Sequence, residues 1–473
     1  MQATTVRLPF ALRYGCRQCS WALLHSFPDG VRPGNCAPFL QQPIDHVRVE
    51  ESSMGIPSSD SPAARPSRRG VLAVTAAMAL SATGLAACGA STSSSSSGCT
   101  SPGVTSQEVK VAVIDPQTGP SATTFDGFLQ AAKARFALQN DEGGVNGRKI
   151  TVVSGDDMGD GAQQVAAARN AVQSQQVFGV LSASRVDTMY DYLKQQNVPV
   201  LGYPGQPAYA ANKNAFGFAG ASATGYVSTA QMLRMKEGGA TNLANLAHNS
   251  AGAINSAKGI DFAAEKVGLK VGMKQWDIPL GSFDATAVAI KMKRAGVDAL
   301  SAQLLTDSSV SILKALRAQG VKLKSVLVAG VYDPKVSSQI SDLLQGAIVT
   351  PVGTVPTELG TPATKKYVDT MAKYAPDTPP NVGFAGPGYV SADLFIRGLE
   401  AAGSCVSRSN FIDSLRKVKD YDGAGLLVTP AVFAPAELPN GTPYVKCAWY
   451  AVYKGTAWVP DAEATCGELY KFD

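Results

Sequence analysis

Short β-branched runs alternate with helical stretches along the chain from residue 108 onward, and this rhythm limits the fold more than any other feature of the sequence. Each apolar run is followed by a loop, an amphipathic helical stretch and the next apolar run. Such alternation is typical of α/β architecture with parallel sheets. In the first block we expect strands at 109–114, 149–153, 177–181 and 198–201, and helices at 126–139, 163–175 and 186–195.

The same rhythm then restarts with a helix expected from Tyr226. Two successive α/β blocks predict two doubly wound lobes, and ligands of such open sheets bind beyond the carboxyl ends of the strands. In the second block we expect strands at 241–246, 270–276, 299–303 and 325–328, and helices at 257–265, 286–295 and 309–318. The loops expected to face a ligand are 115–124, 182–185, 203–209, 248–254, 304–308 and 330–334.

The segment before these blocks resembles a bacterial lipoprotein signal, because an apolar run ends in Leu85-Ala86-Ala87-Cys88. The run, 71–85, is shorter than the ~20 residues that span a bilayer, and three arginines precede it. We therefore expect a signal peptide at 54–87 and a mature protein that begins at a lipidated Cys88. A diacylglyceryl thioether plus an N-acyl chain on that cysteine would meet the two-chain requirement for stable anchoring. Residues 88–106 include a serine-rich tract and are expected to form a flexible linker.

Two questions about the start of the chain stay open. Residues 1–53 precede a conventional start at Met54, and we interpret them as a mis-called leader. The alternative is a small metal site in which one CxxC pair supplies two of the ligands. The candidate ligands are Cys16, Cys19, Cys36 and His46. Arg68-Arg69 also resembles a twin-arginine motif. The sequence therefore leaves open whether the chain is exported by the Sec route or by the twin-arginine route.

Size and charge limit the partners of the mature chain. Removal of residues 1–87 leaves 386 of 473 residues, which suits two lobes of roughly 150–200 residues each. The removed part holds 8 of the 42 Lys and Arg and 5 of the 37 Asp and Glu, so the mature net charge is about +2. No basic face for nucleic acid is implied. We expect a monomer that contacts the membrane through its lipid.

Few residues of the mature chain suit catalysis. It has one histidine, His248, and it lacks the GxSxG, HExxH and paired CxxC motifs. We expect no enzyme activity, no cofactor and no metal. The carboxylates of Asp156, Asp157 and Asp160 are interpreted as helix caps, with a metal cluster as the alternative.

Several motifs together resemble the leucine/isoleucine/valine-binding protein family, whose members are substrate-binding proteins of ABC importers. The resemblance covers nearly all of 108–460. The motifs that carry it are Thr118-Gly119-Pro120 after the first strand, the turn 140–147, Asp156-Asp157 before an Ala-rich helix, 177–184, Val198-Pro199-Val200, Ser282-Phe283-Asp284 and 296–299. The resemblance implies a type I periplasmic-binding fold, in which two lobes are joined by a three-strand hinge and close on a ligand.

The resemblance also implies how the chain is divided between the lobes. The N-terminal lobe would comprise 107–221 and 348–428, and the C-terminal lobe 222–347 and 429–473, including strands at 447–453 and 457–459. Four cysteines besides Cys88 remain in the mature chain, and they allow three pairings. A bridge between lobes away from the hinge would oppose closure. We therefore expect the pairs Cys99–Cys405 and Cys447–Cys466.

In the first lobe, the resemblance implies ligand contacts on two loops. The turn Ser182-Ala183-Ser184 would hydrogen-bond a ligand carboxylate, since hydroxyls and amides supply such bonds without a buried cation. The alternative is that these serines cap a helix at Val186. Tyr203 and Gln206 lie on the next loop and are either ligand contacts or ordinary loop surface.

Other positions of the expected site depart from the family pattern. Thr124 stands where the family's amino-acid binders place a tyrosine, and Ala253 stands near the place of their second-lobe tyrosine. The acid that holds the ligand ammonium falls near Val331, which leaves Tyr332 and Asp333 as candidates; a turn at Asp333-Pro334 is the alternative. A missing acid removes the charge partner that an α-ammonium needs in a closed cleft. We therefore do not expect a branched-chain amino acid as the ligand.

These observations predict an extracytoplasmic solute-binding lipoprotein of an ABC importer, held at the outer face of the cytoplasmic membrane. It would capture a small polar ligand, such as an amino acid, an amide or a related small acid, and deliver it to a permease. The alternatives are a ligand sensor that signals to a membrane partner and, with less support, an exported enzyme.

Overall fold

The computed structural model describes residues 101–218, 225–433 and 445–472. The expected leader, the signal peptide, Cys88, Cys99 and most of the linker lie outside the described residues. Residues Ala90–Asp473 form one compact unit. Within its described part, no helix is both long enough and apolar enough to cross a membrane.

The first lobe is built on a parallel sheet with the strand order β2-β1-β3-β4-β5. The strands are β1 (Glu108–Asp115), β2 (Lys149–Asp156), β3 (Gly179–Ser182), β4 (Val200–Gly202) and β5 (Ala215–Gly217). This doubly wound order requires helical crossovers, because parallel neighbours cannot be joined by a tight turn.

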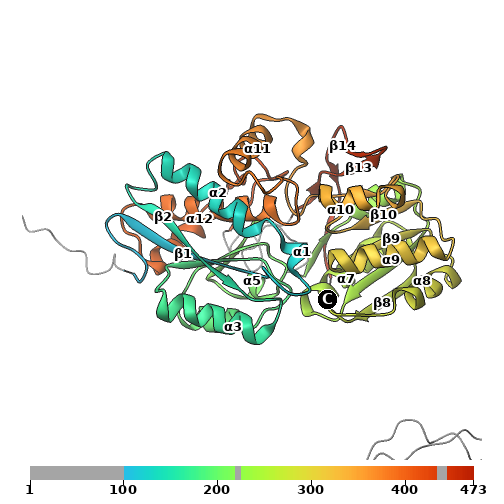
Figure 1. The fold of residues 1–473 in the computed structure, drawn as a ribbon, viewed down its shortest axis with the longest axis horizontal. Coiled ribbons are helices and arrows are strands. Elements are labelled where there is room, and N and C mark those ends of the chain that lie inside the picture. The colour runs from blue at the N-terminus through green and yellow to red at the C-terminus, as the bar shows by residue number, and fades with distance from the viewer. Residues whose placement is uncertain (1–100, 219–224, 434–444, 473) are drawn as a thin grey trace, which may run out of the picture. The chain divides into compact units, whose positions relative to one another are not determined.

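The central strands of this sheet are buried on both faces, which explains why apolar residues predominate in β1, β3 and β4. In β1, Val111 and Val113 belong to one core cluster, and Ala112 and Ile114 belong to another. Successive side chains of a strand point to opposite faces, so the two clusters lie on the two sides of the sheet. Figure 1 shows α2 (Phe128–Asp141) and α12 (Ala385–Ala402) on one side of β1 and β2, and α3 (Gly161–Arg169) on the other.

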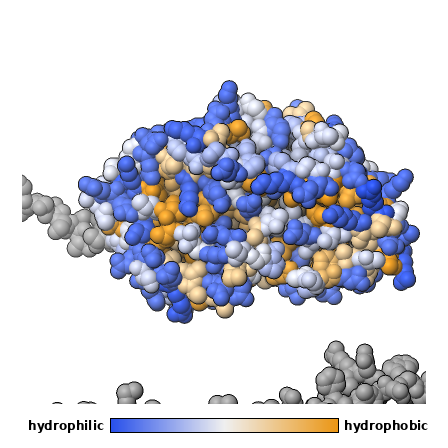
Figure 2. All heavy atoms as spheres, in the orientation of Figure 1, coloured by the Kyte–Doolittle hydropathy of each residue, from blue (hydrophilic) through white to orange (hydrophobic). Residues whose placement is uncertain are grey.

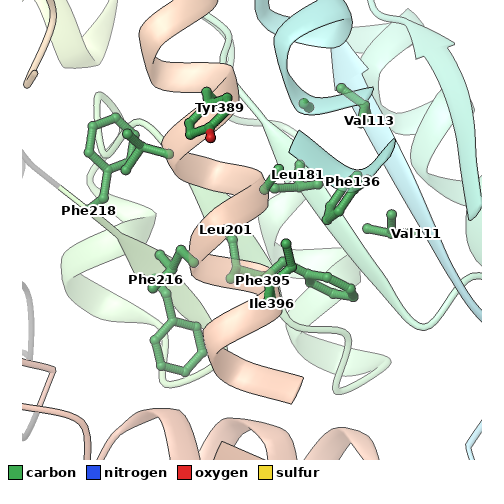
Figure 3. Packing of buried hydrophobic residues seen from close by; sticks show 14 of the residues in the cluster. Val111, Val113, Phe136, Leu181, Leu201, Phe216, Phe218, Tyr389, Phe395 and Ile396 are labelled. Atoms are coloured by element: carbon green, nitrogen blue, oxygen red, sulfur yellow. The ribbon is translucent and has the colours of Figure 1, made fainter. Parts of the chain in front are cut away.

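Helices from two distant parts of the chain cover this sheet. The core between α12 and the sheet includes Phe395, whose ring lies 5.9 Å from that of Phe136 of α2, close to Leu181 and Leu201 (Figure 3). The helices of the first lobe are α1 (Ala122–Phe125), α2 (Phe128–Asp141), α3 (Gly161–Arg169), α4 (Tyr190–Gln195), α5 (Ala208–Ala211), α11 (Pro362–Tyr374), α12 (Ala385–Ala402) and α13 (Arg408–Leu415), with a π-helical turn η1 (Asn170–Ser174) and a 3-10 turn η4 (Thr357–Leu359).

The second lobe is built on a seven-stranded sheet with the order β14-β13-β11-β10-β9-β7-β8. Its strands pair in parallel except at one edge, where β13 pairs antiparallel with both β11 and β14. The strands are β7 (Asn242–His248), β8 (Lys270–Ile278), β9 (Ala299–Gln303), β10 (Ser325–Val328), β11 (Ile348–Val349), β13 (Ala451–Lys454) and β14 (Ala457–Pro460). The helices are α6 (Ala230–Glu237), α7 (Ala251–Lys266), α8 (Ala285–Arg294), α9 (Thr306–Ala318) and α10 (Pro334–Gln339), with the 3-10 turn η3 (Ser341–Leu343).

The helix expected from Tyr226 is wrong. Residues Tyr226–Ser228 form strand β6, which pairs antiparallel with β16 (Leu469–Lys471), and α6 begins only at Ala230. Each of these short strands depends on a partner about 240 residues away in the sequence, so the local pattern did not reveal the pairing.

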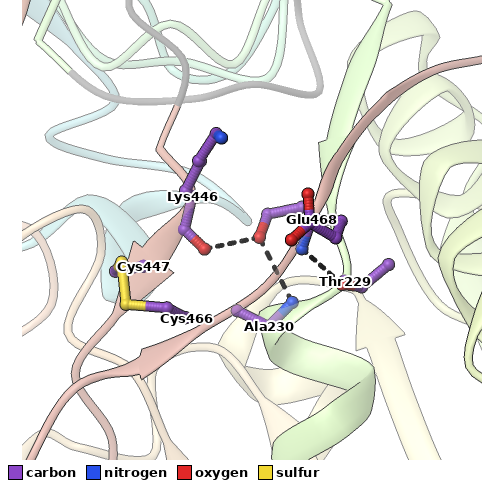
Figure 4. Close-up of a disulfide and its surroundings, with 7 residues drawn as sticks. Thr229, Ala230, Lys446, Cys447, Cys466 and Glu468 are labelled. Atoms are coloured by element: carbon purple, nitrogen blue, oxygen red, sulfur yellow. Dashed lines mark hydrogen bonds between the residues drawn. A yellow bond between two sulfur atoms is a disulfide. The ribbon is translucent and has the colours of Figure 1, made fainter.

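A disulfide joins Cys447 to Cys466, the pairing that the resemblance implied. It connects β12 (Cys447–Ala448) and β15 (Thr465–Cys466), which are themselves paired. Around it, Ser228 Oγ donates to Lys446 O, and Glu468 N donates to Thr229 Oγ1 (Figure 4). Cys405 is also disulfide-bonded, and its expected partner Cys99 lies outside the described residues.

The α/β fold with two doubly wound, parallel-sheet lobes is confirmed, but two of the expected lobe limits shift. β11 pairs with β10 and β13, so the chain leaves the second sheet after residue 349 rather than before 348. Phe433 packs on Phe216 in the first-lobe core, so the chain stays with that lobe beyond residue 428. On the face shown in Figure 2, hydrophobic residues are interspersed among hydrophilic ones.

Candidate ligand-binding site

The two lobes touch through a pair of threonines. Thr124 of α1 is buried, and its Oγ1 accepts a hydrogen bond from the backbone N–H of Thr306 at 2.9 Å. The two threonine hydroxyls lie 3.1 Å apart. Since Thr306 is the first residue of α9, the Thr124 hydroxyl satisfies a helix N-terminal amide of the other lobe. The structure therefore places Thr124 at the meeting of the lobes.

A second contact joins the loop after β4 to the start of α7. A Cβ added to Gly252 would lie 2.2 Å from the carbonyl oxygen of Gly205, so only glycine permits this approach. Gln206 is buried, and its Nε2 donates to the carbonyl of Ser184 at 2.8 Å. Its Oε1 has no hydrogen-bond partner among the described residues. Gln206 therefore ties the serine turn to the loop that contacts the second lobe.

The serine turn Ser182-Ala183-Ser184 is buried at the carboxyl end of β3. The carbonyl of Ser182 accepts from the Tyr209 hydroxyl at 3.3 Å, and Ser184 Oγ accepts from Val186 N at 3.4 Å. Helix α4 begins at Tyr190, so Ser184 stabilises the turn rather than capping that helix.

Tyr203 packs against two other aromatic side chains and lines a cavity between the lobes. Its ring packs edge-on against Phe384 at 5.4 Å and is tilted against Phe218 at 6.4 Å. The cavity has a volume of about 250 Å³. Its other walls come from the second lobe and from the crossover at Thr350–Gly353. A side chain from the first lobe thus forms part of a mainly second-lobe cavity.

Tyr332 and Asp333 bond to elements other than the serine turn. The Tyr332 hydroxyl lies 3.1 Å from Thr357 Oγ1 and donates to Glu358. Asp333 caps α10, where its carboxylate accepts from Lys335 N at 2.8 Å. This cap corresponds to the turn that was the alternative interpretation of Asp333-Pro334.

The three acidic residues after β2 also have structural partners. Asp156 accepts from Gln117 N and from the Thr118 hydroxyl. Asp157 accepts from Gly159 N and from Gln164 Nε2. Asp160 is the N-cap of α3, as the capping interpretation predicted.

Arg185 is the residue that the sequence reasoning missed. It directly follows the serine turn, and its Nε is buried without a hydrogen-bond partner. Burial lowers the pKa of this guanidinium, which lies close enough to Tyr203 and His248 to act on both electrostatically. An arginine beside a predicted ligand turn was the signal available in the sequence.

His248 brings the second lobe up to Arg185. It ends β7, and its Nε2 accepts from Leu305 N at 2.9 Å while Nδ1 lies 3.1 Å from Ile278 O. These partners place the imidazole proton on Nδ1. Burial, and then the charge of Arg185, lower the pKa of His248 to about 4. The imidazole is therefore neutral at pH 7.

A second, open cavity of about 550 Å³ lies between the lobes and is lined by carboxylates. The acids are Asp115, Asp126, Asp307 and Asp333, and Lys335 is nearby. Asp115 is buried at the end of β1, and its pKa is raised to about 7 mainly by that burial. Gln117 Nε2 donates to it at 3.1 Å.

A family model described as periplasmic binding protein matches residues 108–454. The chain belongs to the periplasmic binding protein family. This periplasmic binding protein is 23% identical over 345 residues to the "Leu/Ile/Val-binding protein homolog 7" of Brucella abortus (strain 2308), a match that covers 68% of this chain and 80% of the relative.

Solved structures with the same fold include two that are named for different solutes. The fatty acid ABC transporter substrate-binding protein from Thermomonospora curvata has a TM-score of 0.64 at 20% identity, over 78% of this chain and 95% of that one. A branched chain amino acid ABC transporter structure from Thermus thermophilus with bound valine has a TM-score of 0.63 at 18% identity, over 77% of this chain and 98% of that one. At these identities the likeness establishes the fold of this periplasmic binding protein alone.

Proposed function

We propose that this periplasmic binding protein is the solute-binding lipoprotein of an ABC importer and that it captures a small solute between its two lobes. The observation that carries the proposal is the cavity of about 250 Å³, whose walls come from both lobes and from the crossover between them. The relatives named for leucine, isoleucine and valine, for fatty acids and for bound valine agree with a role in solute uptake.

Closure would be stabilised by the bond between the lobes. When Thr306 N donates to Thr124 Oγ1, a buried amide is satisfied only while the lobes are together. Loss of such a bond costs about 1–2 kcal/mol, because the amide remains buried and unpaired. Solute binding and lobe closure would therefore be linked through this contact.

The test begins with native mass spectrometry of the full chain, purified without denaturation, to find a co-purified solute. Small-angle scattering then measures whether adding that solute back to the emptied chain compacts it. We expect compaction in the wild type and an affinity reduced roughly 5- to 30-fold in Thr124→Val, as the lost bond predicts.

Thr370→Val is the matched control. Thr370 is also buried and bonded through its hydroxyl, to Lys366 O, but within α11 of one lobe. It should leave the solute affinity unchanged. A chain that neither retains a solute nor compacts with any amino acid, amide or carboxylate would contradict the proposal.

A further inference from the structure

Arg185 differs from the other wholly or partly buried arginines of the described chain in that its buried Nε has no hydrogen-bond partner. Arg135 pairs with Asp393 at 2.9 Å, and Arg234 pairs with Asp461 at 2.7 Å. Arg408 donates to three backbone carbonyl oxygens. Among the residues that the structure describes, Arg185 forms neither an ion pair nor a hydrogen bond at its buried Nε.

Arg185 as a whole is half-buried, but its Nε is shielded from water and has no partner among the described residues. An unpaired N–H of a charged group is unfavourable there, because a buried donor needs a compensating acceptor. An arginine does not avoid the cost by losing its proton, since its ordinary pKa lies above 12. The native arrangement therefore leaves a binding place for a negative group beside the serine turn.

The two titratable groups that interact electrostatically with Arg185 are neutral at pH 7. Burial raises the pKa of the Tyr203 hydroxyl, which stays protonated. His248 has a pKa of about 4 and is held as a neutral imidazole by Leu305 N and Ile278 O. Neither residue supplies the missing negative charge.

The second-lobe positions that the family resemblance assigns to the partner of an α-ammonium hold no free acid; Asp307 lines the other, open cavity. Val331 is fully buried in the second-lobe core, and Ala253 is buried in α7. Asp333 is engaged as the cap of α10. A zwitterionic amino acid would bring an ammonium that these positions leave unpaired.

The neighbouring cavity favours an apolar ligand body. Tyr203 both lines this cavity and faces the charge of Arg185, so it connects the two. Among the described residues that line the cavity, none is charged. Its polar groups are partly satisfied already, since Ser256 Oγ donates to Gln303 Oε1 at 3.1 Å. The apolar walls include Val227, Ile260, Ala302, Leu327, Val328 and Val352.

We propose that the ligand is a small carboxylate without a positively charged group, that Arg185 binds its carboxylate, and that its apolar body occupies the cavity beside Tyr203. This inference rests on the proposed function, because it names the class of solute that the closing lobes would capture. It differs from recognition by hydroxyls and amides alone, since here a buried cation provides most of the selectivity for an anion.

Ligands that share one carbon skeleton distinguish three classes of solute: a carboxylate, a neutral amide and a zwitterionic amino acid. We would titrate the full chain by calorimetry with 4-methylpentanoate, its amide, and leucine, which is the same acid with an α-ammonium. Benzoate and octanoate, each with its amide, extend the range of sizes. We expect at least one carboxylate to bind about tenfold or more tightly than its amide, and 4-methylpentanoate to bind more tightly than leucine.

The variant Arg185→Gln should lose that preference. Removing one partner of a buried charge pair lowers affinity about 30-fold or more, so the carboxylate should bind no better than its amide. Affinity for the amide should change by less than about threefold, because the amide makes no ion pair. The midpoint of thermal unfolding shows whether the variant is folded, and Arg317→Gln, an exposed arginine paired with Asp342, is the matched control.

Three results would overturn the inference. One is equal loss of acid and amide affinity in Arg185→Gln, which would mean a structural role. Another is tighter binding of leucine than of 4-methylpentanoate. The last is closure on some other solute with no binding of any carboxylate. In the latter two cases the proposed function stands, whereas a chain that closes on nothing contradicts both proposals.

Discussion

At the scale of single residues, Asp115 is a carboxyl group whose ionisation opposes folding. Burial raises its pKa to about 7, and the nearby charges of Asp157 and Asp156 add to the effect, while the Gln117 amide opposes it. In the unfolded chain its pKa is about 3.9. The native state therefore binds the proton more tightly, and stability falls as the pH rises from about 4 to about 7.

We expect Asp115→Asn to remove this fall. Three pH units correspond to about 4 kcal/mol, so the difference in unfolding free energy between variant and wild type should grow by up to that amount from pH 4 to pH 8. Urea unfolding at several pH values measures it. Asp307→Asn, an exposed carboxylate of the same open cavity, is the control. A difference that stays constant with pH would contradict the assignment.

Sequence reasoning found several residues of the candidate site and missed one, for a physical reason. The loops after the strands predicted that Thr124, Tyr203 and Gln206 lie near the meeting of the lobes, and the structure places them there; their contact with a ligand stays a prediction. The place of Arg185 beside the serine turn is visible in the sequence, but the absence of a partner for its Nε among the described residues is not. That fact depends on three-dimensional packing rather than on spacing along the chain.

At the scale of elements, prediction was best where a strand is buried on both faces. Strands β1 and β9 are largely buried, and their limits were expected to within one residue. Prediction failed at β6, which is only three residues long and takes its stability from β16. Strand pairing over such a sequence distance leaves no periodic signal in either segment.

The Cys447–Cys466 disulfide holds the C-terminal strands together at this same place. Reducing it frees a loop with a sequence separation of 19, which should lower the free energy of unfolding by about 3 kcal/mol in the chain-entropy description. We expect this loss in the variant Cys447→Ala/Cys466→Ala, measured by urea unfolding. Thiol reductant should then have little further effect on this part of the variant, and an unchanged unfolding midpoint would show that β6 and β16 suffice without the bridge.

At the scale of the whole molecule, the chain passes between the lobes after β5, after β11 and after Phe433. Helices α11 to α13 return to the first lobe and contribute to its core, while β13 and β14 complete the second sheet. A solute held between lobes that are joined in this way can be released by a hinge motion, without unfolding either core. Delivery to a membrane permease also requires that the body stay near the membrane.

The last prediction concerns this anchorage. If Cys88 carries the expected lipid, the wild type should fractionate with membranes. The N-terminal peptide of the mature protein should begin at Cys88 and carry the added mass of the lipid. In Cys88→Ala both should be lost, whereas Ser91→Ala in the adjacent linker should behave as the wild type. Solute affinity should be the same in all three chains, because the lobes carry the binding residues. Membrane retention of the Cys88→Ala chain would mean that another segment anchors it.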